Sequence, residues 1–357
     1  MAIAPAPTLG TRLRAGHLLV SWMLDRPLKG GHERGWRDVV LSPPPGEDLP
    51  DAPGRLWLPP RPSPAILLAA GVTPQGTEDP RLMRIAAALC RLGRIVFAPD
   101  LALARHRLDE GDIERLITSA LALDAHPRVR GGVAILGFSF GASYSLVAAA
   151  DPRVAERLRL VASFAGYGDI GGMIQAATTG VTLLDGERYE WQWKAPASRR
   201  DAAVAAILRQ GYLLGVERVE AVAAALRGEV DAAALPRSTR SILDLVTNRD
   251  PTRTGMLVAA LPPPLPQLFA RLSPVRLAQE VRAPVVLLHA RDDPAIPYAE
   301  LRRLAGAFPL ASAYTFRRFS HVDFRPSPRQ LRDTSRDLAT AWRFVARLLA
   351  VGQRDAA

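Results

Sequence analysis

The chain has 357 residues, 48% of them hydrophobic, and a formal net charge of +11 at pH 7. This length and apolar content suit one large or two smaller globular domains and argue against a disordered chain. The positive charge is spread over arginines along the whole sequence, without a dense basic run interleaved with aromatics, so we expect no nucleic-acid partner. The single cysteine, Cys90, excludes an intramolecular disulfide and a cysteine metal cluster.

Residues 1–60 precede the first regular pattern and are expected to form an N-terminal extension. Its predicted elements are a helix over 11–24 and possible strands over 36–42 and 55–58. The apolar run at 18–24 is too short to span a bilayer, and no small-residue cleavage site follows it directly. We therefore expect no stable membrane insertion and a cytoplasmic location.

From residue 61 the sequence alternates between apolar runs of strand length and segments with helical spacing. Strands are predicted over 65–70, 94–98, 132–136 and 158–164, and helices over 79–92, 113–123 and 142–150. This alternation, with uniformly apolar strands, predicts the α/β class: a mostly parallel central sheet flanked by helices on both faces. We expect residues 61–165 and 279–357 to form this core.

The alternation stops between residues 166 and 278. Helical segments are predicted over 202–212, 216–226 and 241–246, and no clear strand is apparent, so we interpret this stretch as an inserted, mainly helical cap. Trp191 and Trp193 alternate with polar residues in it, and we expect them either to line the substrate pocket or to anchor the cap on the core. Strand and helix patterns resume over 283–289, 299–308, 313–319 and 329–349.

The segment Gly137 to Gly141, with the sequence GFSFG, stands between a predicted strand and a predicted helix. In this setting a serine between two glycines predicts a sharp turn that exposes its hydroxyl, because the turn leaves no room for a Cβ at either glycine. The alternative is a glycine-rich turn whose serine only caps the helix. We interpret Ser139 as the candidate nucleophile.

A serine hydroxyl needs a base within hydrogen-bond reach, and that base needs a carboxylate to orient it. Asp293 follows the predicted strand over 283–289, and His321 follows the strand over 313–319. Both are therefore expected at the carboxyl edge of the sheet, where such groups gather. The order Ser139, Asp293, His321 is the one that accompanies this kind of turn.

Other polar residues compete for these roles. Asp292 is adjacent to Asp293, but the Asp-x-x-x-Pro spacing favours Asp293, and Asp169, which follows the strand over 158–164, is a further alternative acid. His289 lies inside a strand end and is expected to be a core residue or to support the catalytic groups. No group of His, Asp and Glu has the spacing of metal ligands, so we expect neither a metal nor another cofactor.

These motifs resemble those of the α/β-hydrolase superfamily, in its serine esterase and dienelactone hydrolase branch, over residues 65–349. The matching motifs are the turn at 137–141, the acid turn at 293–297 and the histidine loop at 320–321, with a weaker match at 92–100. The resemblance implies Ser139 as nucleophile, His321 as general base and acid, and Asp293 as the orienting carboxylate. It also implies an oxyanion hole from the backbone N–H groups of Phe140 and Val72, although the loop at Val72 lacks the His-Gly pair often found there.

We therefore expect a serine hydrolase that cleaves a carboxylic ester or thioester of a small to medium, apolar substrate through an acyl-enzyme. A peptidase or acyltransferase on the same fold is one alternative, and a non-catalytic binding protein that keeps the fold is another. The expected partner is a small-molecule ester. The sequence predicts no particular oligomeric state.

Overall fold

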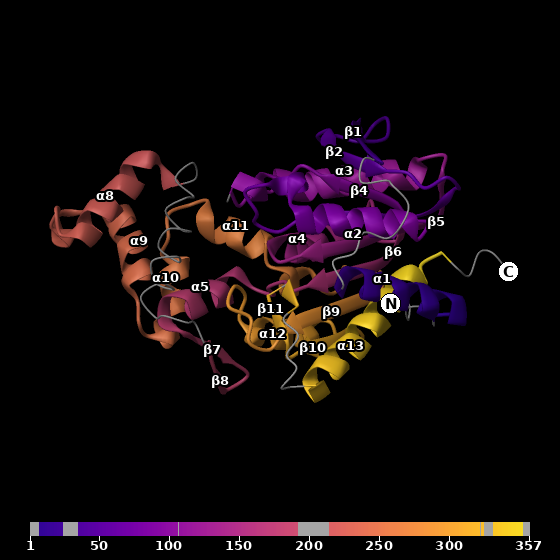
Figure 1. Ribbon diagram of the computed structural model, residues 1–357. Helices are drawn as coiled ribbons and strands as arrows, with labels where there is room; N and C mark the ends of the chain where they lie inside the picture. The colour runs from indigo at the N-terminus through magenta and orange to yellow at the C-terminus, as the bar shows by residue number, and fades with distance from the viewer. Residues whose placement is uncertain are drawn as a thin grey trace.

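The computed structural model describes residues 7–23, 35–105, 107–191, 214–321, 323–324 and 331–352. Its main strands are β1 Trp36–Leu41, β2 Ala52–Trp57, β3 Ser63–Ala69, β4 Ile95–Pro99, β5 Val129–Phe138, β6 Leu158–Phe164, β9 Val285–Ala290 and β10 Ser312–Phe316. These eight strands form one sheet in the order β1-β2-β4-β3-β5-β6-β9-β10 (Figure 1). The helix expected over 202–212 and the residue Trp193 lie outside the described residues.

The sheet is parallel from β4 to β10, and its antiparallel pairs involve β1 and β2 at one edge. Residues 36–57 of the predicted N-terminal extension therefore supply two strands of the same sheet. Every residue of β4 and β9 is buried, as expected for strands covered on both faces. This arrangement confirms the predicted fold class.

Helices cover both faces of the sheet. The first face is covered by α1 Leu9–Met23, α2 Pro80–Arg91 and α13 Leu331–Leu349, and the second by α3 Gly111–Ala125, α4 Phe140–Ala149 and α12 Tyr298–Ala307. Side chains of β5 alternate between the two faces because successive strand residues point in opposite directions. Val133 and Ile135 pack with α3 and α4, whereas Ala134 and Leu136 pack with α2 and α13.

A long segment between β6 and β9 is mainly helical. It contains α5 Ile170–Thr179, β7 Val181–Leu184, β8 Glu187–Glu190, α8 Val216–Arg227, α9 Arg237–Thr247, α10 Thr254–Ala259 and α11 Leu265–Arg271. Figure 1 shows α8, α9 and α10 gathered at one side of the molecule, away from β1 and β2. Buried residues of this segment, such as Val222 and Ile242, belong to the same apolar cluster as α3 and α4.

The hairpin of β7 and β8 corrects one expectation, since no clear strand was predicted in this segment. The two strands pair antiparallel around Asp185 and Gly186. Both turn residues have positive φ, 52° for Asp185 and 78° for Gly186. An Asp-Gly pair is a strong signal for such a two-residue hairpin turn, so the sequence carried the information.

The end of the chain also differs in detail from the prediction. The strand expected over 313–319 divides into β10 and the two-residue β11 Phe319–Ser320, which pairs with β12 Asp323–Phe324. At the other end of the chain, α1 packs along α13, where the Trp342 indole N–H donates to the Arg12 carbonyl at 2.7 Å. Among the described residues, no helix has the length and apolar character needed to cross a membrane.

Candidate active site

Ser139 occupies the turn between β5 and α4. Its backbone has φ 54° and ψ −129°, a conformation that residues with a Cβ rarely adopt. The Ser139 N–H donates to the Phe164 carbonyl at 2.8 Å, and the Ala142 N–H donates to the Ser139 carbonyl at 3.0 Å. The Ser139 side chain makes no capping hydrogen bond to α4. This geometry favours a projected hydroxyl over the alternative of a serine that only caps the helix.

Backbone atoms approach this turn so closely that three glycines cannot be replaced without movement. A Cβ on Gly137 would lie 2.4 Å from a Cα atom of α4, and a Cβ on Gly141 would lie 2.2 Å from the Ala70 carbonyl oxygen. A Cβ on Gly71 would lie 2.6 Å from Ser139 Cβ and 3.3 Å from its Oγ. The loop after β3 therefore passes directly beside the serine hydroxyl.

Asp293 and His321 come from separate loops, after β9 and after β11, and meet in the structure. His321 Nδ1 lies 2.8 Å from Asp293 Oδ2 and 3.1 Å from Oδ1. The Asp293 side chain is fully buried, whereas 19% of the His321 side chain is exposed. An ionised carboxylate only accepts hydrogen bonds, so Nδ1 is the donor, and Nε2 of a neutral ring is left to accept a proton.

The environment of Asp293 keeps its carboxyl group ionised. Burial, the largest influence, raises its pKa, but opposing influences, among them the hydrogen bonds from His321 and from the Ile296 N–H, together outweigh it. The pKa of Asp293 consequently lies below its ordinary value. Two backbone groups, Ala295 N–H at 2.8 Å and Ile296 N–H at 2.9 Å, donate to Oδ1. These bonds fix the carboxylate in one orientation.

His289 lies behind Asp293 in the buried end of β9. Its Nε2 is 3.6 Å from Asp293 Oδ2 and 3.0 Å from the Ile296 carbonyl oxygen. Burial lowers the pKa of His289, so the ring is neutral near pH 7. Since a carbonyl only accepts, Nε2 carries the proton and donates to Ile296. His289 is thus a buried support of the acid loop, in agreement with the sequence-based expectation.

Trp191 connects the segment between β6 and β9 to the acid loop. Its indole N–H donates to the backbone carbonyl of Asp293 at 2.9 Å, and the residue is 8% exposed. Of the two expected roles, lining a pocket or anchoring the segment, this contact favours the anchor. Trp193 lies outside the described residues.

The loop that carries His321 is held from α13. His321 has a positive φ of 59°. Upstream, Asp337 of α13 accepts the N–H of Arg317 at 2.8 Å and the N–H of Arg318 at 2.6 Å. Asp337 is buried, and burial, the largest influence, raises its pKa. The sequence analysis did not single out Asp337; its signal is a carboxylate at helical spacing from Ala341 and Phe344 on the apolar face of a helix.

The alternative acids occupy other positions. Asp169 caps the N-terminus of α5, where its side chain accepts the Gly172 N–H at 2.8 Å. Asp292 is exposed, whereas its neighbour Asp293 points to the histidine. Among the three aspartates weighed from the sequence, the structure brings only Asp293 to His321.

The loop after β3 passes Ser139 at Gly71, and the next residue is Val72, whose backbone N–H was expected to serve the oxyanion hole. Within the described part of the chain, neither this N–H nor that of Phe140, the first residue of α4, donates to a backbone oxygen. The following turn is fixed by Asp79, which accepts the Thr73 hydroxyl at 2.9 Å and caps α2. The hydrogen bond from Arg81, the largest influence, lowers the pKa of Asp79 to about 2. In the described residues, no group of three or more His, Cys, Asp or Glu is arranged to hold a metal ion.

The comparisons with known proteins rest on structure, since no family model and no curated protein matches the sequence. A puromycin-hydrolysing peptidase of Mycobacterium tuberculosis is 19% identical with a TM-score of 0.53, and the match covers 92% of this chain and 40% of the peptidase. A 2,6-dihydroxy-pseudo-oxynicotine hydrolase is 13% identical with a TM-score of 0.50, over 88% of this chain and 67% of that enzyme. This chain thus spans less than half of the peptidase, and at these identities the likeness shows the fold.

Proposed function

Because the chain has the α/β-hydrolase fold, we propose that it is a serine hydrolase acting on a carboxylic ester or thioester. Its substrate is small to medium in size and largely apolar. The reaction passes through an acyl-enzyme on Ser139, with His321 as base and acid and Asp293 as the carboxylate that orients it. No cofactor takes part.

The observation that carries this proposal is the hydrogen bond between His321 and the buried, ionised Asp293. Such a bond fixes the imidazole tautomer and stabilises the imidazolium that forms when a serine is deprotonated. A surface histidine with a structural role has no need of a buried carboxylate held by two backbone N–H groups. Ser139, in its strained turn, is the proposed third member of the set.

In the proposed reaction, Ser139 Oγ attacks the carbonyl carbon while its proton passes to His321 Nε2. The tetrahedral intermediate collapses, His321 returns the proton to the leaving alcohol or thiol, and the acyl group stays on the serine. Water then attacks the acyl-enzyme with His321 again as base, and the carboxylic acid leaves. Acylation and deacylation each pass through a tetrahedral intermediate. In both, the N–H groups of Phe140 and Val72 stabilise the negative charge on the former carbonyl oxygen.

We assign residues 166–278 as a cap over this site, with Trp191 as an anchor between the cap and the acid loop. The core is then formed by 61–165 and 279–357, preceded by the extension 1–60. In this assignment the cap supplies apolar side chains that would contact the substrate.

A substrate panel tests the proposal. It comprises p-nitrophenyl esters from acetyl to decanoyl, a matching thioester and a p-nitroanilide, and it is applied to wild type, Ser139→Ala, Asp293→Asn and the control Ser335→Ala. We expect Ser139→Ala to lose on the order of 10⁴- to 10⁶-fold in kcat/KM and Asp293→Asn about 10⁴-fold. Ser335→Ala, an exposed change on α13, retains wild-type rates.

Two outcomes would contradict the assignment of Ser139 as nucleophile or of an ester as substrate. Ester turnover that survives Ser139→Ala would remove the serine from the reaction. Turnover of the anilide above that of the esters would favour a peptidase, the activity named for the structurally similar M. tuberculosis protein.

A further inference from the structure

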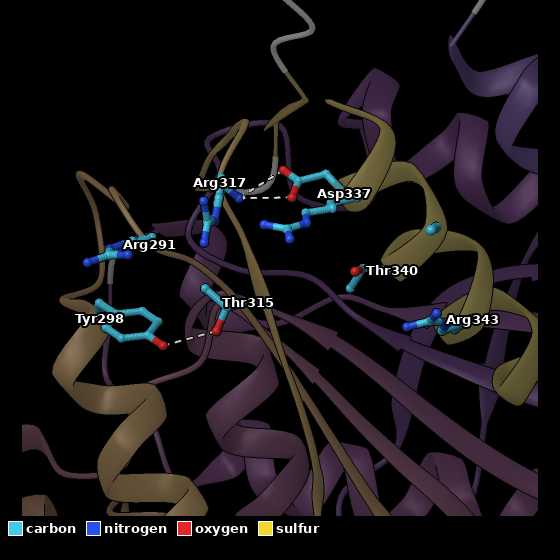
Figure 2. Close-up of a pocket in the computed structure, with 9 residues that line it drawn as sticks. Arg291, Tyr298, Thr315, Arg317, Asp337, Thr340 and Arg343 are labelled. Carbon is cyan, nitrogen blue, oxygen red and sulfur yellow. Dashed lines mark hydrogen bonds between the residues drawn. The ribbon is translucent and has the colours of Figure 1, made fainter. Parts of the chain in front are cut away.

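A groove of about 540 Å³ opens at the β10 edge of the sheet, between α12 and α13 (Figure 2). Four arginines line it, with one aspartate: Arg291, Arg317, Arg336, Arg343 and Asp337. None of the residues proposed for catalysis lies in its wall. Its volume is in the range of sites that bind small molecules.

Among the described residues that line this groove, four arginines face a single aspartate. Within the part of the chain that the structure describes, the guanidinium groups of Arg291, Arg336 and Arg343 form no ion pair or hydrogen bond. Arg317 pairs with Asp333 at 3.1 Å, at the rim. Asp337 directs both carboxylate oxygens to backbone N–H groups, and among the described residues it forms no ion pair with Arg291, Arg336 or Arg343.

Hydroxyl groups complete one end of the groove. Tyr298 Oη and Thr315 Oγ1 lie 3.0 Å apart and share a hydrogen bond, which uses one of their two hydroxyl protons. The other proton remains for a ligand. Figure 2 shows this pair at the same end as Arg291 and Arg317, with Thr340 and Arg343 toward the other end. Guanidinium forks and a hydroxyl donor surrounding one space suit an anion with several oxygens.

We propose that this groove binds a small phosphate-bearing anion, either inorganic phosphate or a phosphate monoester. A phosphate group presents several acceptor oxygens and up to two charges, which match the paired donors of arginine better than a single carboxylate does. The four arginines line one groove, which favours a small ligand over a nucleic acid. Charged residues also protect the open edge of a sheet such as β10, and that role needs no ligand.

Thermal unfolding of the full-length chain separates these possibilities. Titrations with inorganic phosphate, pyrophosphate, a simple phosphate monoester, citrate and a duplex oligonucleotide are run at a constant ionic strength of about 0.15 M. The variants are Arg336→Gln, Arg343→Gln and their combination, with Arg282→Gln, an exposed change at the opposite end of β9, as the control. Changes at Arg291 and Arg317 are avoided because those residues adjoin the acid and histidine loops.

We expect at least one small phosphate to raise Tm by about 3–5 °C at a hundredfold excess over Kd. The double variant loses this shift, and Arg282→Gln keeps it. A preference for the monoester over inorganic phosphate identifies an organic ligand, and the reverse identifies free phosphate. Absence of any shift would leave edge protection as the role of the arginines and overturn the proposal. An equal effect of citrate, or binding of the oligonucleotide alone, would overturn the assignment of a small phosphate.

Discussion

The turn at Ser139 and the loop at His321 both hold a non-glycine residue at positive φ, 54° and 59°, but they are stabilised in different ways. The serine turn is enclosed by backbone atoms of its immediate neighbours and of the loop after β3. The histidine loop is positioned by side chains distant in sequence, Asp293 and Asp337, which contact it from the loop after β9 and from α13.

A residue at positive φ is therefore kept in place by close backbone packing in one case and by side-chain hydrogen bonds in the other. Close backbone packing at the serine tolerates no added atom, so small changes there have large effects. Hydrogen bonds at the histidine loop can be removed one at a time, with a cost of about 1–3 kcal/mol when a buried partner is left without its bond. The predictions below test this distinction.

The largest effect is expected at Gly141. Its replacement by alanine places a Cβ 2.2 Å from the Ala70 carbonyl oxygen, which requires backbone movement beside Ser139. We expect Gly141→Ala to lower the free energy of unfolding by about 3 kcal/mol or more and to abolish ester turnover. The control Gly255→Ala, in α10 with no atom within 4 Å, leaves stability unchanged or raises it by up to about 1 kcal/mol. A stable and active Gly141→Ala protein would refute close packing as the constraint.

A smaller effect is expected at Asp337, in the support of the histidine loop. Asp337→Asn replaces one acceptor oxygen by an N–H₂ group that faces the backbone donors of Arg317 and Arg318. We expect a loss of about 1–3 kcal/mol in urea unfolding and a drop in kcat of about 10- to 100-fold, because His321 is misplaced. Asp333→Asn, which removes a partly exposed ion pair with Arg317, changes both by much less. An unchanged kcat in Asp337→Asn would show that this carboxylate does not position His321.

The loop beside the serine is also expected to respond to pH through Asp79. Its pKa of about 2 lies below the ordinary 3.8, so its contribution to stability is complete above pH 4 and is lost as the pH falls toward 2. The contribution is at most about 2 kcal/mol, because Arg81 is 49% exposed and water screens the pair. Unfolding of wild type and Asp79→Asn should therefore differ at pH 7 and converge near pH 2. A difference that persists at pH 2 would attribute the effect to something other than ionisation.

The smallest effect is expected at Trp191, the proposed anchor between the segment 166–278 and the acid loop. Trp191→Phe removes the hydrogen bond to the Asp293 carbonyl and should lower kcat/KM by about fivefold, equivalent to about 1 kcal/mol. Trp342→Phe removes a hydrogen bond of the same kind to the Arg12 carbonyl, remote from the candidate site. Trp342→Phe should therefore change the stability of the protein and leave kcat/KM unchanged. Equal loss of activity in both variants would contradict an anchoring role at the acid loop.

Local patterns in the sequence predicted the parts of the molecule that local interactions determine. The apolar strands, the flanking helices and the motif at 137–141 were readable because their periodicity and glycines act within a few residues. The β7–β8 turn at Asp185 and Gly186 carries a comparable local signal, an Asp-Gly pair between two short strands. The Asp337 contacts to the histidine loop and the Trp191 contact to Asp293 depend on the tertiary fold, which brings together residues 19 to 102 positions apart. No spacing rule could specify those pairs.

The most direct test of the central claim is labelling with a fluorophosphonate probe, which reacts with an activated serine without requiring the natural substrate. Wild type, Ser139→Ala, His321→Ala and the control Ser335→Ala would be labelled, and the modified peptide located by mass spectrometry. We expect one adduct on Ser139 in wild type and Ser335→Ala, with none in the other two variants. A folded wild-type protein that remains unlabelled, or an adduct on another serine, would contradict this expectation.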